Sequence, residues 1–390
     1  MGQTEQKQSW WNNGQNRALV FQVVLTLAVV LFFWYIINNT LLNMEKRGIA
    51  TGFGFLSQAA GFGIIQHLVA YDETYSFGRT FLVGLLNTLL VAVIGIVFAT
   101  IIGLVVGVAR LSSNWLISTL AAVYIEVFRN IPLLLQIFFW YFAVLRGLPL
   151  PRGSWEVNES FFMNIRGLYI PRPIFESGFS WVIWAVVLAF VVAFVIRRWA
   201  RRRQAETGQQ FNSTLAGLGV ILILPLTVFF AVGSPLSWEV PVLKGFNFKG
   251  GMVVIPELTA LVVALSIYTG AFIAEIVRSG ILAVSHGQTE AALSLGLRPR
   301  RVLSLVVIPQ ALRVIIPQQT SQYLNLVKNS SLATAIGYPD LVSVFAGTTL
   351  NQTGQAMEVI AMTMGVYLFI SLTISALMNW YNKKKMLIER

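Results

Sequence analysis

Long apolar segments constrain this chain more than any other feature of its sequence. A hydrocarbon core about 30 Å thick is crossed by roughly 20 apolar residues in a helix. The segments of the 390-residue chain that reach or approach this length are Ala18–Asn38, Leu82–Ala109, Leu116–Leu145, Trp181–Ile196, Leu215–Val232, Leu258–Leu282, Leu312–Leu332 and Met357–Trp380. The sequence therefore predicts an all-α polytopic membrane protein with about eight transmembrane helices.

The composition excludes several other classes of protein. Hydrophobic residues make up 56% of the chain and charged residues only 11%, whereas soluble domains carry about a quarter charged residues. So much apolar surface cannot be hidden in one aqueous core. Cysteine is absent, which excludes disulfides, thiolate metal sites and a cysteine nucleophile. A disordered chain, a disulfide-rich secreted domain and an ordinary soluble enzyme are thereby excluded.

The basic residues indicate how the spans are oriented. With the N-terminus placed in the cytoplasm, the inward segments carry 15 basic and four acidic residues, and the outward segments carry nine basic and ten acidic residues. Cytoplasmic loops of membrane proteins are enriched in Lys and Arg. This bias explains most of the net charge of +12 without nucleic-acid binding. We therefore expect both termini in the cytoplasm, the first near Lys7 and the last near Arg390.

The chain lacks the residue patterns of common catalytic sites. It contains no Gly-Lys dipeptide, and hence no P-loop, and no G-x-S-x-G nucleophile elbow. Its two histidines, His67 and His286, are far apart, and we interpret both as interfacial or loop residues. The sequence predicts no catalytic residue, no metal site and no cofactor in this chain. Energy for any transport would have to come from an ion gradient or from a partner.

The most informative segment runs from Ala283 to Pro309, between the sixth and seventh spans. Ser285 opens a capping box, so a helix should begin there, with Glu290 in its first turn. Gly296 is placed to end that helix in a left-handed conformation, and Pro299 to begin a second one. We expect a short helix, a glycine turn and another helix that project from the bilayer. The plain alternative is an ordinary amphipathic loop.

A motif in this segment resembles that of a known family. An E-A-A sequence is followed by Gly four residues after its second alanine and by Ile-Pro twelve residues further on. This pattern resembles the cytoplasmic coupling loop of binding-protein-dependent ABC importer permeases. The matching residues are Glu290, Ala291, Ala292, Gly296, Ile308 and Pro309. The resemblance implies that the short helix docks into a groove on a subunit that hydrolyses ATP.

Four further segments resemble the polar amino acid branch of these permeases. They are GLLNTLLVA (84–92), YIEVFRNIPLLLQIFFWYF (124–142), YTGAFIAEIVRSGILAV (268–284) and LVKNSSLATAIGYPDL (326–341). The remaining spans and GFGFL (52–56) resemble the longer permeases of general L-amino acid importers. One residue departs from the pattern, because the branch often has Asp where this chain has Asn329. A Lys–Asp pair with Lys328 is therefore not expected.

The resemblance implies a five-helix permease core with three extra spans. Residues 82–145 would form the first part of this core, and residues 258–390 the second part with the coupling loop. Residues 1–81 would hold the N-terminal span and a Gly-rich periplasmic segment. Residues 146–257 would hold inserted periplasmic loops and two extra spans.

Charged residues within the spans form two expected pairs. Glu126 with Arg129, and Glu275 with Arg278, are each three residues apart and can meet on one side of a helix. Charges in a span are costly and normally face a partner or a wet cavity. Local neutralisation or helix pinning is the simpler interpretation. The alternative is a cytoplasmic gate that exchanges partners between states.

The seventh span carries four carboxamides on one face. A lipid-facing stripe of amides would be unsatisfied, so this face should contact protein or water. Hydrogen bonding between helices and a substrate path for a zwitterion both explain it, and Lys328 could meet a carboxylate. The candidate residues of the path are Tyr268, Thr269, Gln318, Gln322, Asn325, Lys328, Asn329, Ser330 and Ser331.

Taken with the resemblance, these features imply a permease subunit of a bacterial ABC importer in the inner membrane. The importer would have broad specificity and would carry amino acids into the cytoplasm. The implied partners are a cytoplasmic ATPase dimer that holds ATP and Mg²⁺, a second homologous permease and a periplasmic amino acid-binding protein. The alternatives are an importer of another small polar solute, an ion-driven secondary transporter and a channel-like or structural subunit. A secondary transporter would leave the E-A-A motif unexplained.

Overall fold

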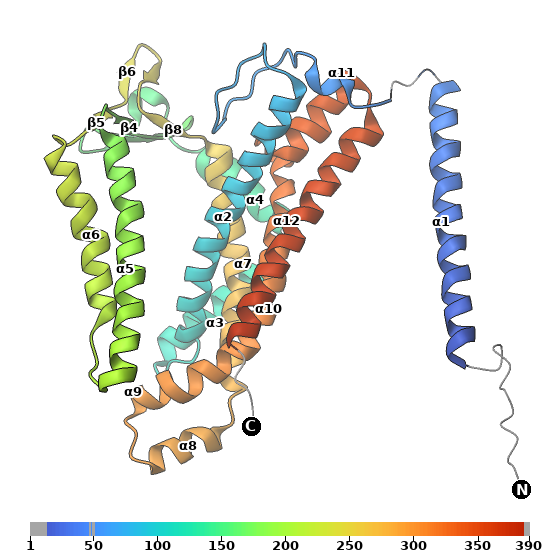
Figure 1. Ribbon diagram of the computed structural model, residues 1–390. Coiled ribbons are helices and arrows are strands. Elements are labelled where there is room, and N and C mark those ends of the chain that lie inside the picture. The colour runs from blue at the N-terminus through green and yellow to red at the C-terminus, as the bar shows by residue number, and fades with distance from the viewer. Residues whose placement is uncertain (1–13, 47, 49–50, 386–390) are drawn as a thin grey trace, which may run out of the picture. The chain divides into compact units, whose positions relative to one another are not determined.

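The computed structural model describes residues 14–46, 48 and 51–385. Of the expected inward residues at the two ends, Lys7 and Arg390 lie outside the described residues. The chain is mainly helical (Figure 1) and divides into two compact units, the first of Met1–Asn130 with Leu265–Arg390 and the second of Ile131–Ala264. One long helix, α7 (Pro256–Leu282), contributes to both units.

Seven helices in the described part of the chain are long and apolar enough to cross a membrane. They correspond to α1 (Gly14–Lys46), α2 (Phe77–Ala109), α5 (Phe179–Thr207), α6 (Ser213–Ala231), α7, α10 (Ile308–Asn329) and α12 (Ala356–Lys385). They confirm seven of the expected spans. Their ends differ from the expected ones by several residues, since apolar patterning does not mark where a helix stops outside the hydrocarbon.

The expected third span, Leu116–Leu145, is not one continuous helix. It consists of α3 (Trp115–Asn130), α4 (Leu133–Phe138) and the π-helical turn η3 (Phe139–Leu145), with a break between α3 and α4. Pro132 stands at this break in an extended conformation, with φ −54° and ψ 134°. Proline has no N–H to donate and clashes with the preceding turn, which favours a break in the helix at this position.

Short helical elements connect the long ones. They are η2 (Gly54–Ser57), η4 (Pro151–Gly153), α8 (His286–Ser294), α9 (Pro299–Val302), η5 (Leu303–Val307), η6 (Ser330–Ile336), η7 (Val342–Thr349) and α11 (Leu350–Thr353). Among them, η5 and η7 are π-helical. The expected helix, glycine turn and second helix after residue 283 are confirmed in α8, Gly296 and α9.

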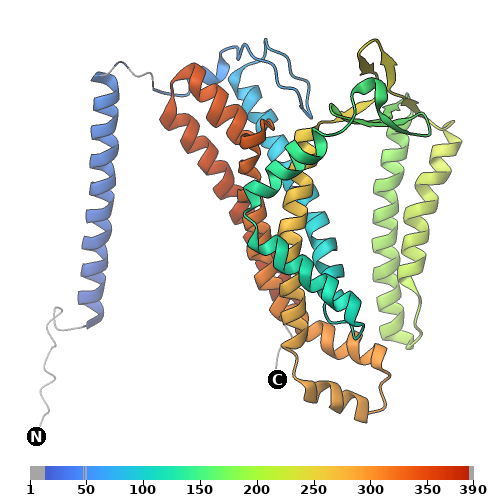
Figure 2. The same ribbon diagram turned by 180° about the vertical axis from the view of Figure 1, so that it is seen from behind.

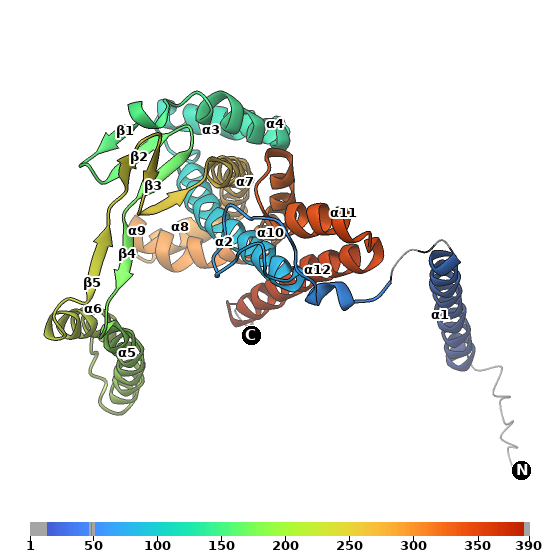
Figure 3. The ribbon, with the colours of Figure 1, turned by 90° about the horizontal axis from the view of Figure 1, so that it is seen from above.

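In the first unit, α10 packs against both α2 and α12 (Figure 3). Small residues let the backbones approach. A Cβ atom on Gly107 of α2 would lie 2.7 Å from the carbonyl oxygen of Ala274 in α7, so only glycine fits there. The core around this contact is apolar and fully buried, with Ile273 and Leu326 both at 0% exposure. This close packing fixes the faces that α7 and α10 turn outward.

Buried polar groups of α2 hold the segment that follows α10. The Asn87 side chain donates to the carbonyl oxygens of Gln66 and Pro339, each at 2.8 Å. The Thr88 hydroxyl accepts from the backbone N–H of Leu341 at 3.0 Å. These bonds satisfy backbone groups that would otherwise be unpaired in the interior.

The second unit contains the antiparallel pair α5 and α6 (Figures 1 and 2) and eight short strands. The strands are β1 (Trp155–Val157), β2 (Phe161–Asn164), β3 (Gly167–Ile170), β4 (Arg172–Phe175), β5 (Leu236–Glu239), β6 (Val242–Lys244), β7 (Asn247–Lys249) and β8 (Met252–Val254). They form a β1-β2-β3-β8 sheet and the pairs β4-β5 and β6-β7. At three or four residues each, they are too short for alternation to reveal them in the sequence.

Candidate functional site

A polar cavity of about 370 Å³ lies in the first unit, between the end of α3, the last turns of α7 and the middle of α10. Its lining residues are Arg129, Phe272, Glu275, Ile276, Ser279, Gln318, Ser321 and Gln322. The cavity brings together two groups of residues that the sequence presented as separate candidate sites. One group is the charged residues of the third and sixth spans, and the other is the carboxamides of the seventh span.

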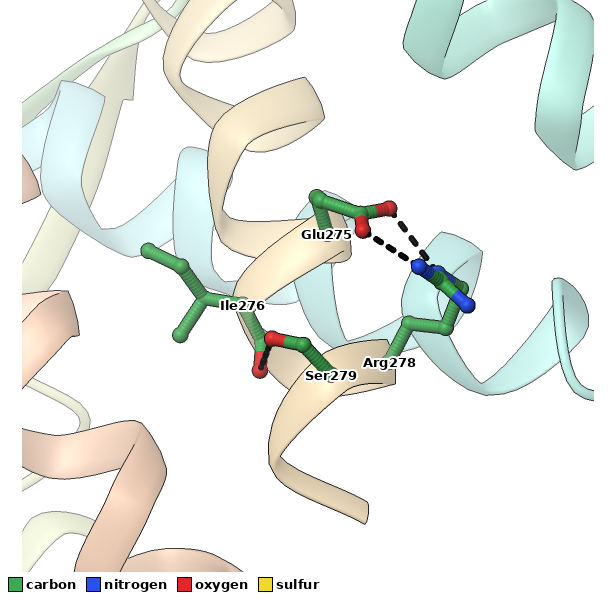
Figure 4. Close-up of polar contacts among 4 residues, drawn as sticks. All are labelled: Glu275, Ile276, Arg278 and Ser279. Carbon is green, nitrogen blue, oxygen red and sulfur yellow. Dashed lines mark hydrogen bonds and ion pairs between the residues drawn. The ribbon is translucent and has the colours of Figure 1, made fainter. Parts of the chain in front are cut away.

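The expected ion pair between Glu275 and Arg278 is confirmed. The Arg278 guanidinium makes two bonds to the Glu275 carboxylate, Nε to Oε2 at 3.0 Å and Nη2 to Oε1 at 2.6 Å (Figure 4). Both side chains are about 30% exposed (31% for Arg278 and 28% for Glu275), so the pair lies at the edge of the packed core. A two-bond pair fixes the carboxylate more firmly than one contact would. The hydroxyl of Ser279, which also lines the cavity, is turned to the backbone oxygen of Ile276 at 3.1 Å.

The expected pair between Glu126 and Arg129 is wrong. Both residues belong to the described part of the chain, yet the Glu126 carboxylate accepts from the Asn130 side chain at 3.4 Å instead. The Arg129 guanidinium lies over the Phe272 ring, 5.1 Å from its centroid. Spacing of three residues permits an ion pair, but the aromatic face offered by α7 competes for the same cation. Arg129 is therefore directed to the cavity.

The carboxamides of α10 share one face, as expected, but they do not share one environment. Gln318 and Gln322 line the cavity. Asn325 and Lys328, further along the same face, are exposed and lie outside the cavity lining. Asn329 is partly buried. Within a span, an exposed amide or ammonium requires water or a second protein surface.

Other candidates for the path are used by the fold. Ser330 is 1% exposed and its hydroxyl donates to the Val327 carbonyl oxygen at 2.8 Å. The Ser331 hydroxyl donates to the Lys328 carbonyl oxygen at 2.7 Å. Thr269 is 2% exposed, and the Tyr268 ring packs on Phe272 at 5.0 Å. None of these four lines the cavity.

The helix α8 and the turn at Gly296 that follows it, which we call the α8 segment, project from the end of the first unit where α7 ends and α10 begins (Figures 1 and 2). Gly296 has the expected left-handed conformation, with φ +77°, and its N–H donates to the Leu293 carbonyl oxygen at 2.9 Å. Ser285 is the N-cap residue, but its side chain makes no capping bond, so the expected capping box is wrong. Because α8 begins at His286, Glu290 lies beyond the first turn and contacts the His286 Nδ1 at 3.0 Å.

One side of α8 packs on the chain and the other is open. Ala292 is 5% exposed, because α8 packs against α9 and η5. Leu293 is 44% exposed and Leu295 is 83% exposed. Ile308 is 40% exposed at the start of α10, beside Pro309. Exposed leucines on a projecting helix are typical of a surface that a partner covers.

Comparison with known proteins identifies the family. Residues 185–386 match the family model described as "Binding-protein-dependent transport system inner membrane component". A putative amino-acid ABC transporter permease protein of Escherichia coli K12, YhdX, is 57% identical over 96% of this chain and 95% of its own length. The general L-amino acid transport system permease protein AapQ of Rhizobium johnstonii is 52% identical over 96% of this chain and 93% of its own. The chain belongs to the family of binding-protein-dependent transport inner membrane components.

A third relative is more distant. The glutamate/glutamine/aspartate/asparagine transport system permease protein BztB of Rhodobacter capsulatus is 40% identical over 96% of this chain and 95% of its own length. Each of the three alignments covers 96% of this chain, so each extends into the α1, α5 and α6 segments as well as the core. The matched family region of this inner membrane component contains α8 and α10, but begins within α5 and leaves α2 and α3 outside it.

The sequence patterns did not predict the hydrogen bonds that two tyrosines make between helices of this inner membrane component. The Tyr323 hydroxyl contacts the Thr100 hydroxyl at 2.8 Å and accepts from the Gln319 side chain at 2.6 Å. The Tyr124 hydroxyl donates to the Ile267 carbonyl oxygen at 2.7 Å. A Gln and a Tyr four residues apart on α10 were a usable signal for the contact between Gln319 and Tyr323. Nothing in the sequence indicates the other two contacts, which join α10 to α2 and α3 to α7.

Proposed function

We propose that this inner membrane component is the substrate-translocating subunit of an ATP-driven ABC importer that carries amino acids of broad specificity from the periplasm to the cytoplasm. The observation that carries the proposal is the pairing of a cavity lined by charges and carboxamides with an exposed α8 segment on the same unit. The names of the relatives, which refer to amino-acid permeases, support the class of substrate.

The cavity chemistry suits a zwitterion. The Arg129 guanidinium can accept an α-carboxylate, since two parallel N–H bonds match a carboxylate. The Glu275 carboxylate can meet the ammonium group, with Arg278 holding its position. Gln318 and Gln322 offer both donors and acceptors to either group. No group in this set selects one side chain, which agrees with broad specificity.

The α8 segment would dock on a separate ATPase dimer, which binds ATP and Mg²⁺, while this chain itself holds no cofactor and hydrolyses nothing. A second homologous permease would cover the exposed polar face of α10, because lipid cannot satisfy Asn325 and Lys328. The family description, which refers to a binding protein, supports a periplasmic amino acid-binding protein as the donor of substrate.

Transport in proteoliposomes tests the proposal against an ion-driven secondary transporter. We expect ATP-dependent uptake of several L-amino acids when the permease pair, the ATPase and the binding protein are reconstituted together. Uptake should vanish without the ATPase and should not depend on a proton or sodium gradient. Gradient-driven uptake by this chain alone would overturn the proposal. ATP-driven uptake of another small polar solute, with amino acids excluded, would overturn only its substrate.

We also propose that the chain is a multi-pass protein of the bacterial inner membrane with both termini in the cytoplasm. Because the chain has no cysteine, single cysteines report orientation directly. Lys244, at the exposed end of β6, and Gln204, at the exposed end of α5, are suitable positions. An impermeant thiol reagent added to intact spheroplasts should label Lys244→Cys but not Gln204→Cys. Equal labelling of the two would contradict this orientation.

A further inference from the structure

The end of α5 carries a concentration of positive charge that the transport function does not use. Its arginines are Arg197, Arg198, Arg201, Arg202 and Arg203. The positive-inside bias explains why this end is cytoplasmic, but it does not require five arginines within seven residues. Their depth, their arrangement around the helix and their lack of acidic partners point to a ligand.

The first observation is depth. Residues 179–196 of α5 contain no charged side chain. At 1.5 Å per residue they span about 27 Å, close to the thickness of the hydrocarbon core. Arg197 therefore stands at the hydrocarbon boundary, and Arg202 about 8 Å beyond it. The headgroup layer is roughly 5–8 Å deep on each side, so these arginines lie at the level of lipid phosphates rather than in open cytosol.

The second observation is the arrangement. With 100° between successive helical residues, Arg197, Arg198, Arg201 and Arg202 fall within an arc of about 140°. We call these four residues the basic arc. The opposite side of α5, with Ala185 and Ala189 at 6% and 0% exposure, packs against α6. The basic arc therefore faces away from α6, and its arginines are exposed.

Arg203 differs from the other four. Its Nη2 donates to the Gln209 side-chain oxygen at 2.7 Å, and its guanidinium lies 5.3 Å from the centre of the Trp199 ring. It lies on the α6 side of the helix and stabilises the turn between α5 and α6. It thus provides an internal comparison, an arginine of the same helix end whose guanidinium already has partners within the hairpin.

The third observation is that nothing in this hairpin neutralises the basic arc. Glu206 is the only acidic residue between 197 and 214, and none of the ion pairs found among the described residues involves these arginines. Four adjacent guanidinium groups repel one another unless an anion lies between them. The forked donors of arginine match phosphate oxygens in pairs, which a lysine ammonium cannot do.

We propose that the basic arc binds the phosphate groups of anionic phospholipids in the cytoplasmic leaflet, and so fixes the α5–α6 hairpin at a defined depth in the membrane. The site selects headgroup charge, and its depth favours a lipid over an acidic protein surface. Phosphatidylglycerol, with one phosphate, and cardiolipin, with two, are the probes of choice, and phosphatidylcholine is the zwitterionic control.

The test measures lipid adducts on the full chain, purified in detergent, by native mass spectrometry at equal added amounts of each lipid. We expect wild type to retain cardiolipin and phosphatidylglycerol in preference to phosphatidylcholine. The double variant Arg198→Gln/Arg202→Gln should lose roughly thirtyfold in affinity for the anionic lipids, since each arginine at the membrane surface contributes about fivefold. Arg203→Gln, the matched control, should bind as wild type does.

A second variant guards against loss of membrane orientation. Arg198→Lys/Arg202→Lys keeps the inward charge and should insert normally, yet it loses the paired phosphate contacts and should bind roughly threefold to tenfold more weakly. Displacement of the lipid by millimolar inorganic phosphate would show a free-phosphate site and overturn the proposal. Equal retention of phosphatidylcholine, an unchanged Arg198→Lys/Arg202→Lys variant, or loss of a co-purified protein instead of lipid would also overturn it. None of these measurements depends on transport.

Discussion

The α8 segment and the polar cavity beside α10 differ in how their residues come together. The α8 segment is built by neighbours in sequence, since the backbone N–H groups that end its helix around Gly296 all donate to the carbonyl oxygens of Ala291, Ala292 and Leu293. The cavity is built by residues far apart in sequence, from Arg129 on α3 to Gln322 on α10. One is a local structure presented to a partner, and the other exists only through helix packing.

This difference has a consequence for mutations. A Cβ atom at Gly296 would meet nothing within 4 Å in this chain, so a side chain there disturbs only the backbone conformation and whatever docks on α8. A change in the cavity instead removes a partner from groups held by several helices. Substitutions in α8 should therefore affect assembly with the ATPase, and substitutions in the cavity should affect uptake by an assembled complex.

The largest effect is expected at Gly296. Gly296→Arg should abolish uptake and remove the co-purified ATPase, because a left-handed conformation costs a side-chain residue about 1–2 kcal/mol and the new side chain would stand on the docking surface. Gly296→Asn is the control, since Asn tolerates the left-handed conformation better than Arg does. This variant should keep more of the uptake and more of the co-purified ATPase than Gly296→Arg does. A Gly296→Arg protein that retains its ATPase and imports normally would remove the assignment of α8 as the coupling element.

The next largest effect is expected at Glu275. Glu275→Gln should lower uptake roughly tenfold or more, because Arg278 loses a two-bond partner at the edge of the core and hydrogen bonds to charged groups are among the strong ones. ATPase co-purification should stay at the wild-type level. Glu126→Gln, the matched control, removes a carboxylate that has no ion pair with Arg129 and should change uptake less than about twofold. Equal losses in the two variants would break the distinction between cavity and surface carboxylates.

A smaller effect separates the two halves of the α10 face. Gln318→Leu, in the cavity, should reduce uptake several-fold, the size of one lost hydrogen bond. Asn325 and Lys328 lie outside the cavity. Asn325→Leu and Lys328→Met should therefore reduce uptake several-fold only if a second permease continues the substrate path along α10. The three variants are compared by their initial uptake rates in complexes of matched ATPase content. Normal uptake by both of the latter variants would limit the path to the cavity, and normal uptake by Gln318→Leu would remove α10 from it.

Asn329→Asp belongs with this series. The residue is partly buried and lies outside the cavity lining, so near-normal uptake is expected. A strong gain or loss would show that the side chain at this position takes part in transport.

The smallest effect is expected at Glu290. Its contact with His286 is exposed, with 67% of the Glu290 side chain and 86% of the His286 side chain accessible. Exposed pairs contribute little to stability, so Glu290→Ala should lower ATPase retention and uptake by less than about threefold. A loss as complete as that of Gly296→Arg would show that Glu290 makes a direct contact with the ATPase.

The sequence alone determined the features that depend on neighbours along the chain. Apolar runs of about 20 residues predicted all seven long helices, because crossing hydrocarbon requires an unbroken apolar helix. The left-handed turn at Gly296 followed from a residue that adopts positive φ without strain, and the new helix at Pro299 from a residue suited to the first turn of a helix. The ion pair between Glu275 and Arg278 followed from spacing on one helix.

Only the tertiary structure decided which polar groups meet across helices. It placed Arg129 over Phe272 rather than beside Glu126 and brought Glu275 to Gln318. It left Asn325 and Lys328 outside the cavity, although they share a face with Gln318. Spacing fixes only the face of a helix on which a side chain lies. The partner of that side chain depends on close packing between backbones, as at Gly107 and Ala274, and this packing joins residues far apart in the chain.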